Sequence, residues 1–205
     1  SVVPGQDFTS VRASTGLFVE IEAGSEENKI EVKGPQRDKV NIEVDEGELQ
    51  LSLPVGQIFS EAEVLVIVYA KQVDELKARS GSEVEFKNKV VQKELRLIAS
   101  EGSYIGGDLD VESLRVKSVT GASISLVGIA NTTSIEVKTG GSYDGEGLIS
   151  KTSSVSLSYG GEATVHATKT CSASVTAGGD ITVYGNPGTI SQSVKLGGNI
   201  DVVEE

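Results

Sequence analysis

Carboxylates that recur at matching places in a repeat are the residues of this chain that could do chemistry. A short motif, Gly-x-x-Φ with Φ mostly apolar, recurs along the sequence, and acids stand two residues after its first glycine at Glu83, Glu162 and Asp180. Glu162 and Asp180 belong to consecutive copies, so we expect their side chains about 5–7 Å apart on neighbouring strands. Two carboxylates at that spacing could serve as the acid and base of polysaccharide cleavage. The simpler interpretation, which we favour, is solvated charge at a turn.

Two further acidic pairs could ligate calcium. Asp108 with Asp110, and Asp144 with Glu146, lie in what the sequence presents as wider loops. Carboxylate oxygens suit Ca²⁺, but neither pair matches an EF-hand loop or a repeated Gly-Gly-x-Gly-x-Asp array. We therefore predict no cofactor and no resident metal, and keep these four residues as the calcium candidates.

Three tyrosines give the clearest hint of ligand binding. Tyr104 and Tyr159 fall at outward positions next to turns, and Tyr184 precedes a turn. Rings on a flat sheet rich in serine and threonine could stack on sugars, although scattered surface tyrosines are common. Together with Glu162 and Asp180, these tyrosines form the candidate ligand-binding set.

Histidine and cysteine occur once each. His166 follows an inward valine, so we expect it to point into solvent. Cys171 is in phase with mostly apolar positions of the other copies, which predicts a buried small side chain rather than a nucleophile. The sequence has no Gly-x-Ser-x-Gly elbow and no Walker loop. We therefore predict a protein without enzymatic activity.

The repeat itself must position all of these residues. Its copies are separated by 21, 19, 19, 20, 18 and 19 residues, and an isolated copy lies upstream. A period near 20 residues is typical of a solenoid. Apolar residues stand mainly three and five positions to either side of each glycine, which indicates two half-buried strands joined by a tight corner. The predicted corner glycines, which include the first in the glycine-rich stretch 140–147, are Gly16, Gly81, Gly102, Gly121, Gly140, Gly160, Gly178 and Gly197.

Glycine suits such corners because it adopts positive φ without steric cost. The residue after each of the last seven corner glycines is alanine, serine or glycine, which allows backbones to approach closely. All the glycines of 140–147 are read as corners on this basis.

Residues 1–72 form a less regular β region. We expect a strand around Phe8–Ala13, a hairpin made by Val40–Val44 and Leu49–Leu53, a loop at Pro54–Ala62, and a strand at Val64–Tyr69 that is buried on both faces. This region is predicted to cap the regular solenoid of residues 73–205 and to be continuous with it, as one structural unit.

The C-terminal end of the solenoid needs protection as an exposed strand edge. Glu204 and Glu205, next to Asp201, place charge there, which would oppose edge-to-edge aggregation. The alternative is that this end adds a strand to another subunit, so that the protein forms a homo-oligomer through its end strands.

Composition excludes several classes of partner. The net charge of −12 argues against nucleic acid and anionic membranes, because phosphate binding requires a basic surface. No apolar run reaches the roughly 18 residues that span a membrane, so we expect no membrane insertion of this segment. The sequence begins with Ser1 rather than methionine, and we expect an export signal to precede it.

Several motifs, taken in order, resemble a known family. They are the opening at residues 8–11 and 16–21, the hairpin at 40–53, the strand at 64–69, the Gly-Gly-Asp-Ile and Gly-Gly-Asn-Ile corners, and Val-Tyr-Gly-Asn-Pro at 183–187. This pattern is similar to the "putative auto-transporter adhesin, head GIN domain" family of exported bacterial proteins, many of them from Bacteroidetes. The resemblance implies an all-β fold, a right-handed single-stranded β-helix of the pectin-lyase-like kind. It also implies a role in cell adhesion and no known catalytic residues.

Three functions follow from these observations. The first is a non-enzymatic exported protein that is at the cell surface, outer-membrane-anchored or periplasmic, and that binds a surface protein or glycan of a host or neighbouring cell. The second is a β-helix that binds or cleaves polysaccharide. The third is a structural envelope protein that assembles through its end strands.

Overall fold

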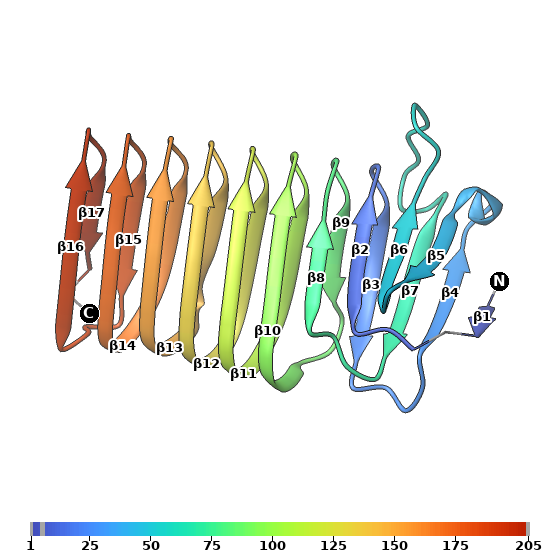
Figure 1. The fold of residues 1–205 in the computed structure, drawn as a ribbon, viewed down its shortest axis with the longest axis horizontal. Coiled ribbons are helices and arrows are strands. Elements are labelled where there is room, and N and C mark those ends of the chain that lie inside the picture. Colours follow the sequence, from blue (N-terminus) through green and yellow to red (C-terminus); the bar gives the residue numbers. More distant parts are fainter. Residues whose placement is uncertain (1, 5–6, 204–205) are drawn as a thin grey trace.

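The protein is a β-solenoid, as predicted (Figure 1). The structure is a computed structural model and describes residues 2–4 and 7–203. Glu204 and Glu205, the predicted charges at the C-terminal end, lie outside the described residues. The handedness and the pectin-lyase relationship remain predictions from the family resemblance.

The regular part stacks coils in parallel register. Its strands are β8 (Glu75–Ala78), β9 (Glu83–Phe86), β10 (Val90–Ser100), β11 (Tyr104–Val119), β12 (Ser123–Lys138), β13 (Ser142–Ser158), β14 (Glu162–Thr176), β15 (Asp180–Tyr184), β16 (Thr189–Lys195) and β17 (Asn199–Val202). Equivalent strands of successive coils pair in parallel, and strands inside the stack have a partner on each side. The coils therefore satisfy backbone hydrogen bonds on their neighbours.

In β11 to β14, one strand runs from each corner to the next, and its pairing is interrupted only by register shifts. This continuity corrects the prediction that the acidic pairs lie in wider loops. Asp108 and Asp110 lie within β11, and Asp144 and Glu146 lie within β13.

The corners are two-residue turns in which both residues have positive φ. Thr120 has φ 53° and Gly121 has φ 71°, and the other corner glycines are likewise preceded by a residue of positive φ. Two consecutive residues of positive φ define a type I′ turn, whose twist matches that of the flanking strands. The first position is unusual here because it holds Ser, Glu, Thr, Tyr, Ala or Leu rather than the asparagine or glycine that this turn favours.

Two glycines of the stretch 140–147 are not corners, which corrects that reading. Gly145 and Gly147 lie inside β13. A Cβ atom at Gly145 would collide with the ring and hydroxyl of Tyr143, and one at Gly147 would come within 2.8 Å of Val127. These glycines are therefore needed for close packing rather than for a turn.

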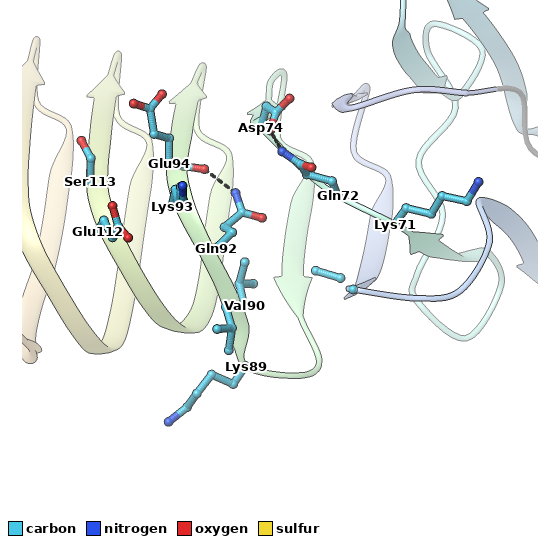
Figure 2. Close-up of a pocket in the computed structure, with 13 residues that line it drawn as sticks. Lys71, Gln72, Asp74, Lys89, Val90, Gln92, Lys93, Glu94, Glu112 and Ser113 are labelled. Carbon is cyan, nitrogen blue, oxygen red and sulfur yellow. Dashed lines mark hydrogen bonds between the residues drawn. The ribbon is translucent and has the colours of Figure 1, made fainter.

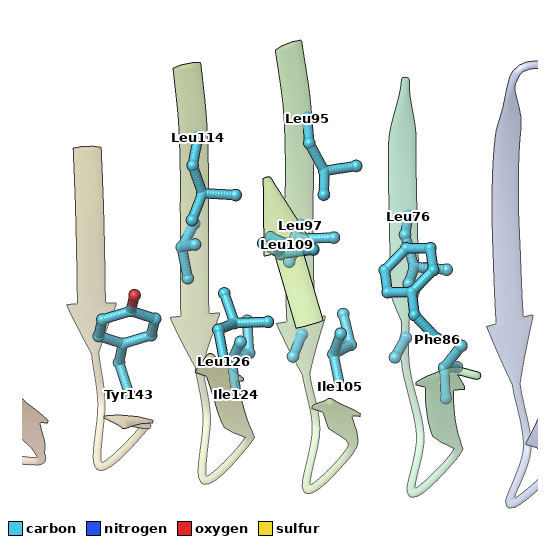
Figure 3. Close-up of a cluster of buried hydrophobic side chains, with 14 of the residues drawn as sticks. Leu76, Phe86, Leu95, Leu97, Ile105, Leu109, Leu114, Ile124, Leu126 and Tyr143 are labelled. Carbon is cyan, nitrogen blue, oxygen red and sulfur yellow. The ribbon is translucent and has the colours of Figure 1, made fainter. Parts of the chain in front are cut away.

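Inward side chains stack in columns along the solenoid (Figure 3). One column runs through Leu95, Leu114, Thr133, Ser153, Cys171 and Ile190 in strict register. The two hydroxyls at its centre satisfy each other, with Thr133 Oγ1 donating to Ser153 Oγ at 2.9 Å. Cys171 is buried, as predicted, and burial raises the pKa of its thiol, which makes it a poor nucleophile.

The N-terminal coils do not stack in sequence order. Strand β2 (Ser10–Ser14) lies between β6 (Glu48–Ser52) and β8, and β3 (Phe18–Ala23) lies between β7 (Leu65–Ala70) and β9. The coil with the isolated corner Gly16 is thus enclosed between a coil that follows it in the sequence and the start of the regular repeat. The loop between β6 and β7 extends from the corner end (Figure 1).

Antiparallel strands close the N-terminal end. Strand β4 (Lys29–Lys33) pairs with β7, β5 (Asn41–Asp45) pairs with β6, and β1 (Val2–Pro4) pairs with β4. The only helical element in the described chain is the 3-10 turn η1 (Arg37–Lys39). The prediction for β7 was partly wrong: Val66, Ile67 and Val68 are buried, but Tyr69 is half-buried, with the Lys29 ammonium 4.9 Å from its ring centroid.

Candidate functional site

One outward column of the solenoid carries three exposed β-branched side chains, with Asp110 between the first and the second. It consists of Val91, Asp110, Ile129, Ile149, His166 and Tyr184, which stand opposite one another on β10 to β15. We name it the outer column. Val91 is 72 % exposed, Ile129 55 % and Ile149 45 %, and Val127 beside them is also exposed. Three large β-branched side chains therefore face solvent in a single row.

Outward positions elsewhere carry paired charges. Glu48 binds Arg12 at 3.3 Å and Lys77 at 2.7 Å, and Glu75 binds Lys77 at 2.7 Å and Arg96 at 3.4 Å. This network crosses β6, β2, β8 and β10, which is the usual way to keep a sheet face soluble. The outer column lacks such pairing, and this contrast makes it the leading candidate for a contact surface.

A β-bulge shapes the middle of the outer column. Strand β13 carries residues 145–148 where β14 carries only Val165, and register resumes at Ile149 opposite His166. The His166 Nδ1 atom lies 3.1 Å from the carbonyl oxygen of Glu146 in the bulge, so neutral His166 holds its proton on Nδ1. His166 is therefore half-buried and tied to the bulge, not free in solvent as predicted.

The predicted carboxylate pair lies in adjacent coils. Glu162 stands directly opposite Asp180, and Asp180 stands opposite Asn199. Asn199 Nδ2 donates to Asp180 Oδ1 at 2.8 Å. Both carboxylates are exposed, so neither has the apolar enclosure that holds a general acid protonated.

Two of the four calcium candidates, Asp108 and Asp144, contact neighbouring groups through one carboxylate oxygen each, and the other oxygen of Asp108 is buried without a hydrogen-bond partner among the described residues. Asp108 Oδ2 lies 3.6 Å from Lys89 Nζ, and Asp144 Oδ1 accepts a hydrogen bond from the Glu146 amide at 3.2 Å. Within residues 2–4 and 7–203, no three side chains among His, Cys, Asp and Glu come together in a metal-binding arrangement.

The three predicted tyrosines lie in different places. Tyr104 is half-buried in the column that also contains Glu162, and burial, followed by the charges of Glu85 and Glu83, raises the pKa of its hydroxyl. Tyr159 occupies the first position of a corner, with φ 61°. Only Tyr184 belongs to the outer column. The structure thus does not assemble a single sugar-stacking platform from these rings.

A groove of about 790 Å³ adjoins the first residue of the outer column (Figure 2). It is lined by Val91 together with charged and amide side chains, including Lys71, Asp74, Gln92 and Lys93. The groove was not predicted from the sequence. A signal for it was present, because the spacing of 21 residues between Gly81 and Gly102 is the longest between successive corner glycines of the regular repeat. The extra length lies where β9 ends at Phe86 and the chain rejoins the sheet at Val90.

Residues 7–187 match the family described as "putative auto-transporter adhesin, head GIN domain". The chain belongs to this family. Solved structures similar to this head GIN chain include proteins from Bacteroides and Parabacteroides species. A putative adhesin from Bacteroides fragilis is 18 % identical with a TM-score of 0.88, and the alignment covers 99 % of this chain and 95 % of that one.

A putative adhesin from Parabacteroides distasonis is 18 % identical with a TM-score of 0.72, covering 99 % of this chain and 95 % of the other. A structure named as a putative lipid binding protein from the same species is 14 % identical with a TM-score of 0.71, covering 100 % and 96 %. At these identities the likeness establishes the fold. No curated protein matches the head GIN chain.

No helix among the described residues is long and apolar enough to cross a membrane.

Proposed function

We propose that this head GIN chain is an exported, non-enzymatic adhesion protein that contacts its partner through the outer column. The observation that carries the proposal is the presence of exposed Val91, Ile129 and Ile149 in one outward column, whereas the outward face of β6, β2, β8 and β10 carries paired charges. Family membership and the similar putative adhesins support the same function.

The chemistry of the outer column favours a protein partner over a glycan. Ile129 and Ile149 offer apolar area, while Tyr184 and His166 add groups that combine an apolar ring with a polar atom. Sugar-stacking sites use several aromatic rings, and Tyr184 is the only tyrosine in the outer column. The proposed partner is therefore a protein on the surface of a host or neighbouring cell.

The scaffold suits such a contact because it is rigid. Ile129 and Ile149 are paired with residues of the neighbouring coils on both sides, and the His166 contact to Glu146 holds the bulge. A partner that binds this face pays little for ordering it, so modest apolar area can give useful affinity.

The second candidate, cleavage of polysaccharide, rests on the register of Glu162 opposite Asp180. The purified protein should be incubated with a panel of plant, host and bacterial polysaccharides, alongside the variants Glu162→Gln and Asp180→Asn. The adhesion proposal expects no release of reducing ends by any of the three proteins. Release by the wild type that both variants lose would replace adhesion with hydrolysis.

Export and surface display are tested in the native bacterium. We expect the protein in the envelope fraction and expect it to be accessible to antibody on intact cells if it is displayed outward. A protein found only in the cytoplasm would contradict an adhesion role, and one accessible only after the outer membrane is permeabilised would place it in the periplasm.

A further inference from the structure

The C-terminal end of the solenoid is an open sheet edge. Strand β16 pairs with β14, and β17 pairs with β15, and neither has a second partner on its outer edge among residues 2–4 and 7–203. Figure 1 shows β16 and β17 at the far end of the stack. Such an edge presents unpaired backbone N–H and C=O groups that can pair with another chain.

The last residues of the inward columns are only partly buried at this end. Cys171 and Val175 are buried, but the next residues of their columns, Ile190 and Val194, are half-buried and 47 % exposed. Ile200 and Val202 in β17 are likewise only half-buried, whereas Ile181 and Val183 before them are fully covered. One more coil packed on β16 and β17 would cover all four side chains.

The N-terminal end of the solenoid, in contrast, is covered by antiparallel strands and charged side chains that oppose pairing with another chain. There β5 and β1 run antiparallel to the strands that they cover, and the exposed strand β5 carries Glu43 and Asp45. Charged side chains on an edge strand oppose pairing with a second chain. The two edge strands themselves carry little charge, because β16 has only Lys195 and β17 only Asp201. Two such ends can approach although the chain has a net charge of −12.

We propose that β16 pairs antiparallel with β16 of a second copy of this chain, about a two-fold axis at Gln192. The strand reads Thr-Ile-Ser-Gln-Ser-Val-Lys, so this register is self-complementary. Ile190 faces the partner's Val194, and the inward columns of the two copies join. Gln192 faces the partner's Gln192, and Lys195 faces the partner's Thr189, so no two like charges meet.

This contact leaves the outer column accessible in both copies, because β16 is not one of its strands. The dimer and the adhesion surface are therefore separate proposals. Either one can fail without affecting the other.

The test is the oligomeric state of Gln192→Lys, with Ser193→Lys as the matched control. Both positions are exposed in β16, Gln192 in the inward column between Ile190 and Val194 and Ser193 on the outward face, so each variant should fold. Only the lysine at 192 faces its own copy across the two-fold axis, where like charges repel. Sedimentation across a concentration series should show a dimer for wild type and Ser193→Lys, and a monomer for Gln192→Lys at the same concentration.

A crosslink provides the second measurement. Gln192→Cys should form a disulfide-linked dimer under a mild added oxidant, because directly opposed strand residues lie within disulfide distance. Ser193→Cys should crosslink far less, since it faces the partner's Ser191. A monomeric wild type at every concentration would overturn the proposal. So would a dimer that Gln192→Lys leaves intact, or equal crosslinking at both positions.

Discussion

Ile129 stands directly opposite Ile149 on neighbouring strands, with 55 % and 45 % of the two side chains exposed. In the middle of a solenoid, a pair of isoleucines at adjacent outward positions has no core to complete. Burying these two side chains against a partner would contribute about 25 cal/mol for each Å² of apolar surface removed from water. The pair is therefore the expected centre of the contact surface.

The positive φ of the residue before each corner glycine suggests a substitution that should stabilise the protein. Thr120 is an exposed β-branched residue with φ 53°, and no hydrogen bond of its hydroxyl is seen. The left-handed region costs such a residue about 1–2 kcal/mol, and asparagine tolerates it better. Thr120→Asn should raise the free energy of unfolding by about 0.5–1 kcal/mol in urea titrations.

Thr15 is the control for that substitution. It also has positive φ, but its Oγ1 accepts a hydrogen bond from the Leu53 amide at 2.7 Å. Thr15→Asn should therefore give no gain, because the relief of backbone strain is offset by the lost hydrogen bond. Equal stabilisation by both substitutions would show that the Leu53 contact contributes nothing.

Adjacent glycines at one corner should differ in their tolerance of a side chain. Gly160 has φ 79° and open space where a Cβ would lie, whereas Gly161 has φ 108° and its Cβ would overlap the carbonyl oxygen of Gly141 in the coil before it. Gly160→Ala should cost about 1–2 kcal/mol from backbone strain. Gly161→Ala should cost at least about 3 kcal/mol, because overpacking is added. Similar losses in chemical denaturation would mean that the coils are not packed as closely as described.

The burial of Tyr143 leads us to expect that the free energy of unfolding falls at alkaline pH. Burial, and then the charge of Asp144, raises the pKa of Tyr143 above its ordinary value of 10.0. The folded state therefore keeps the hydroxyl protonated after the unfolded chain has lost its proton. The stabilising contribution is present below about pH 10 and is lost progressively as pH rises above that value.

The corresponding variant is Tyr143→Phe. Its free energy of unfolding should fall less steeply than that of wild type between pH 9 and roughly pH 11. The exposed Tyr159 is the control, and Tyr159→Phe should leave the slope unchanged. If the free energy of unfolding of Tyr143→Phe fell with pH as steeply as that of wild type, the ring would not be buried.

The repeat could be predicted from the sequence because it is local. The glycine spacing and the alternation around it identify the corners and place Cys171 in its column, since neighbouring coils must align. The stacking of the Gly16 coil could not be predicted, because its position between β6 and β8 depends on contacts between residues far apart in the sequence. Periodicity shows that a coil exists but not which coils are its neighbours.

The candidate site was harder to predict than the fold. Ile129 and Ile149 fall outside the Gly-x-x-Φ motif, and one extra residue in β13 shifts Ile149 by one position relative to its corner. Alignment on the corner glycines therefore hides the outer column. Tyr184 was predicted to be an exposed ring and is half-buried, and its alignment with His166 and Ile149 emerges only from the strand register.

The most direct test compares adhesion by Ile149→Lys with that by Ser154→Lys. Both residues are exposed on β13, and only Ile149 belongs to the outer column. Beads coated with each protein are counted on host epithelial cells and on neighbouring gut bacteria. We expect wild type and Ser154→Lys to adhere equally, and Ile149→Lys to lose at least about ten-fold in binding, as for the loss of a central interface residue. Equal adhesion by all three proteins would contradict the outer column as the contact surface.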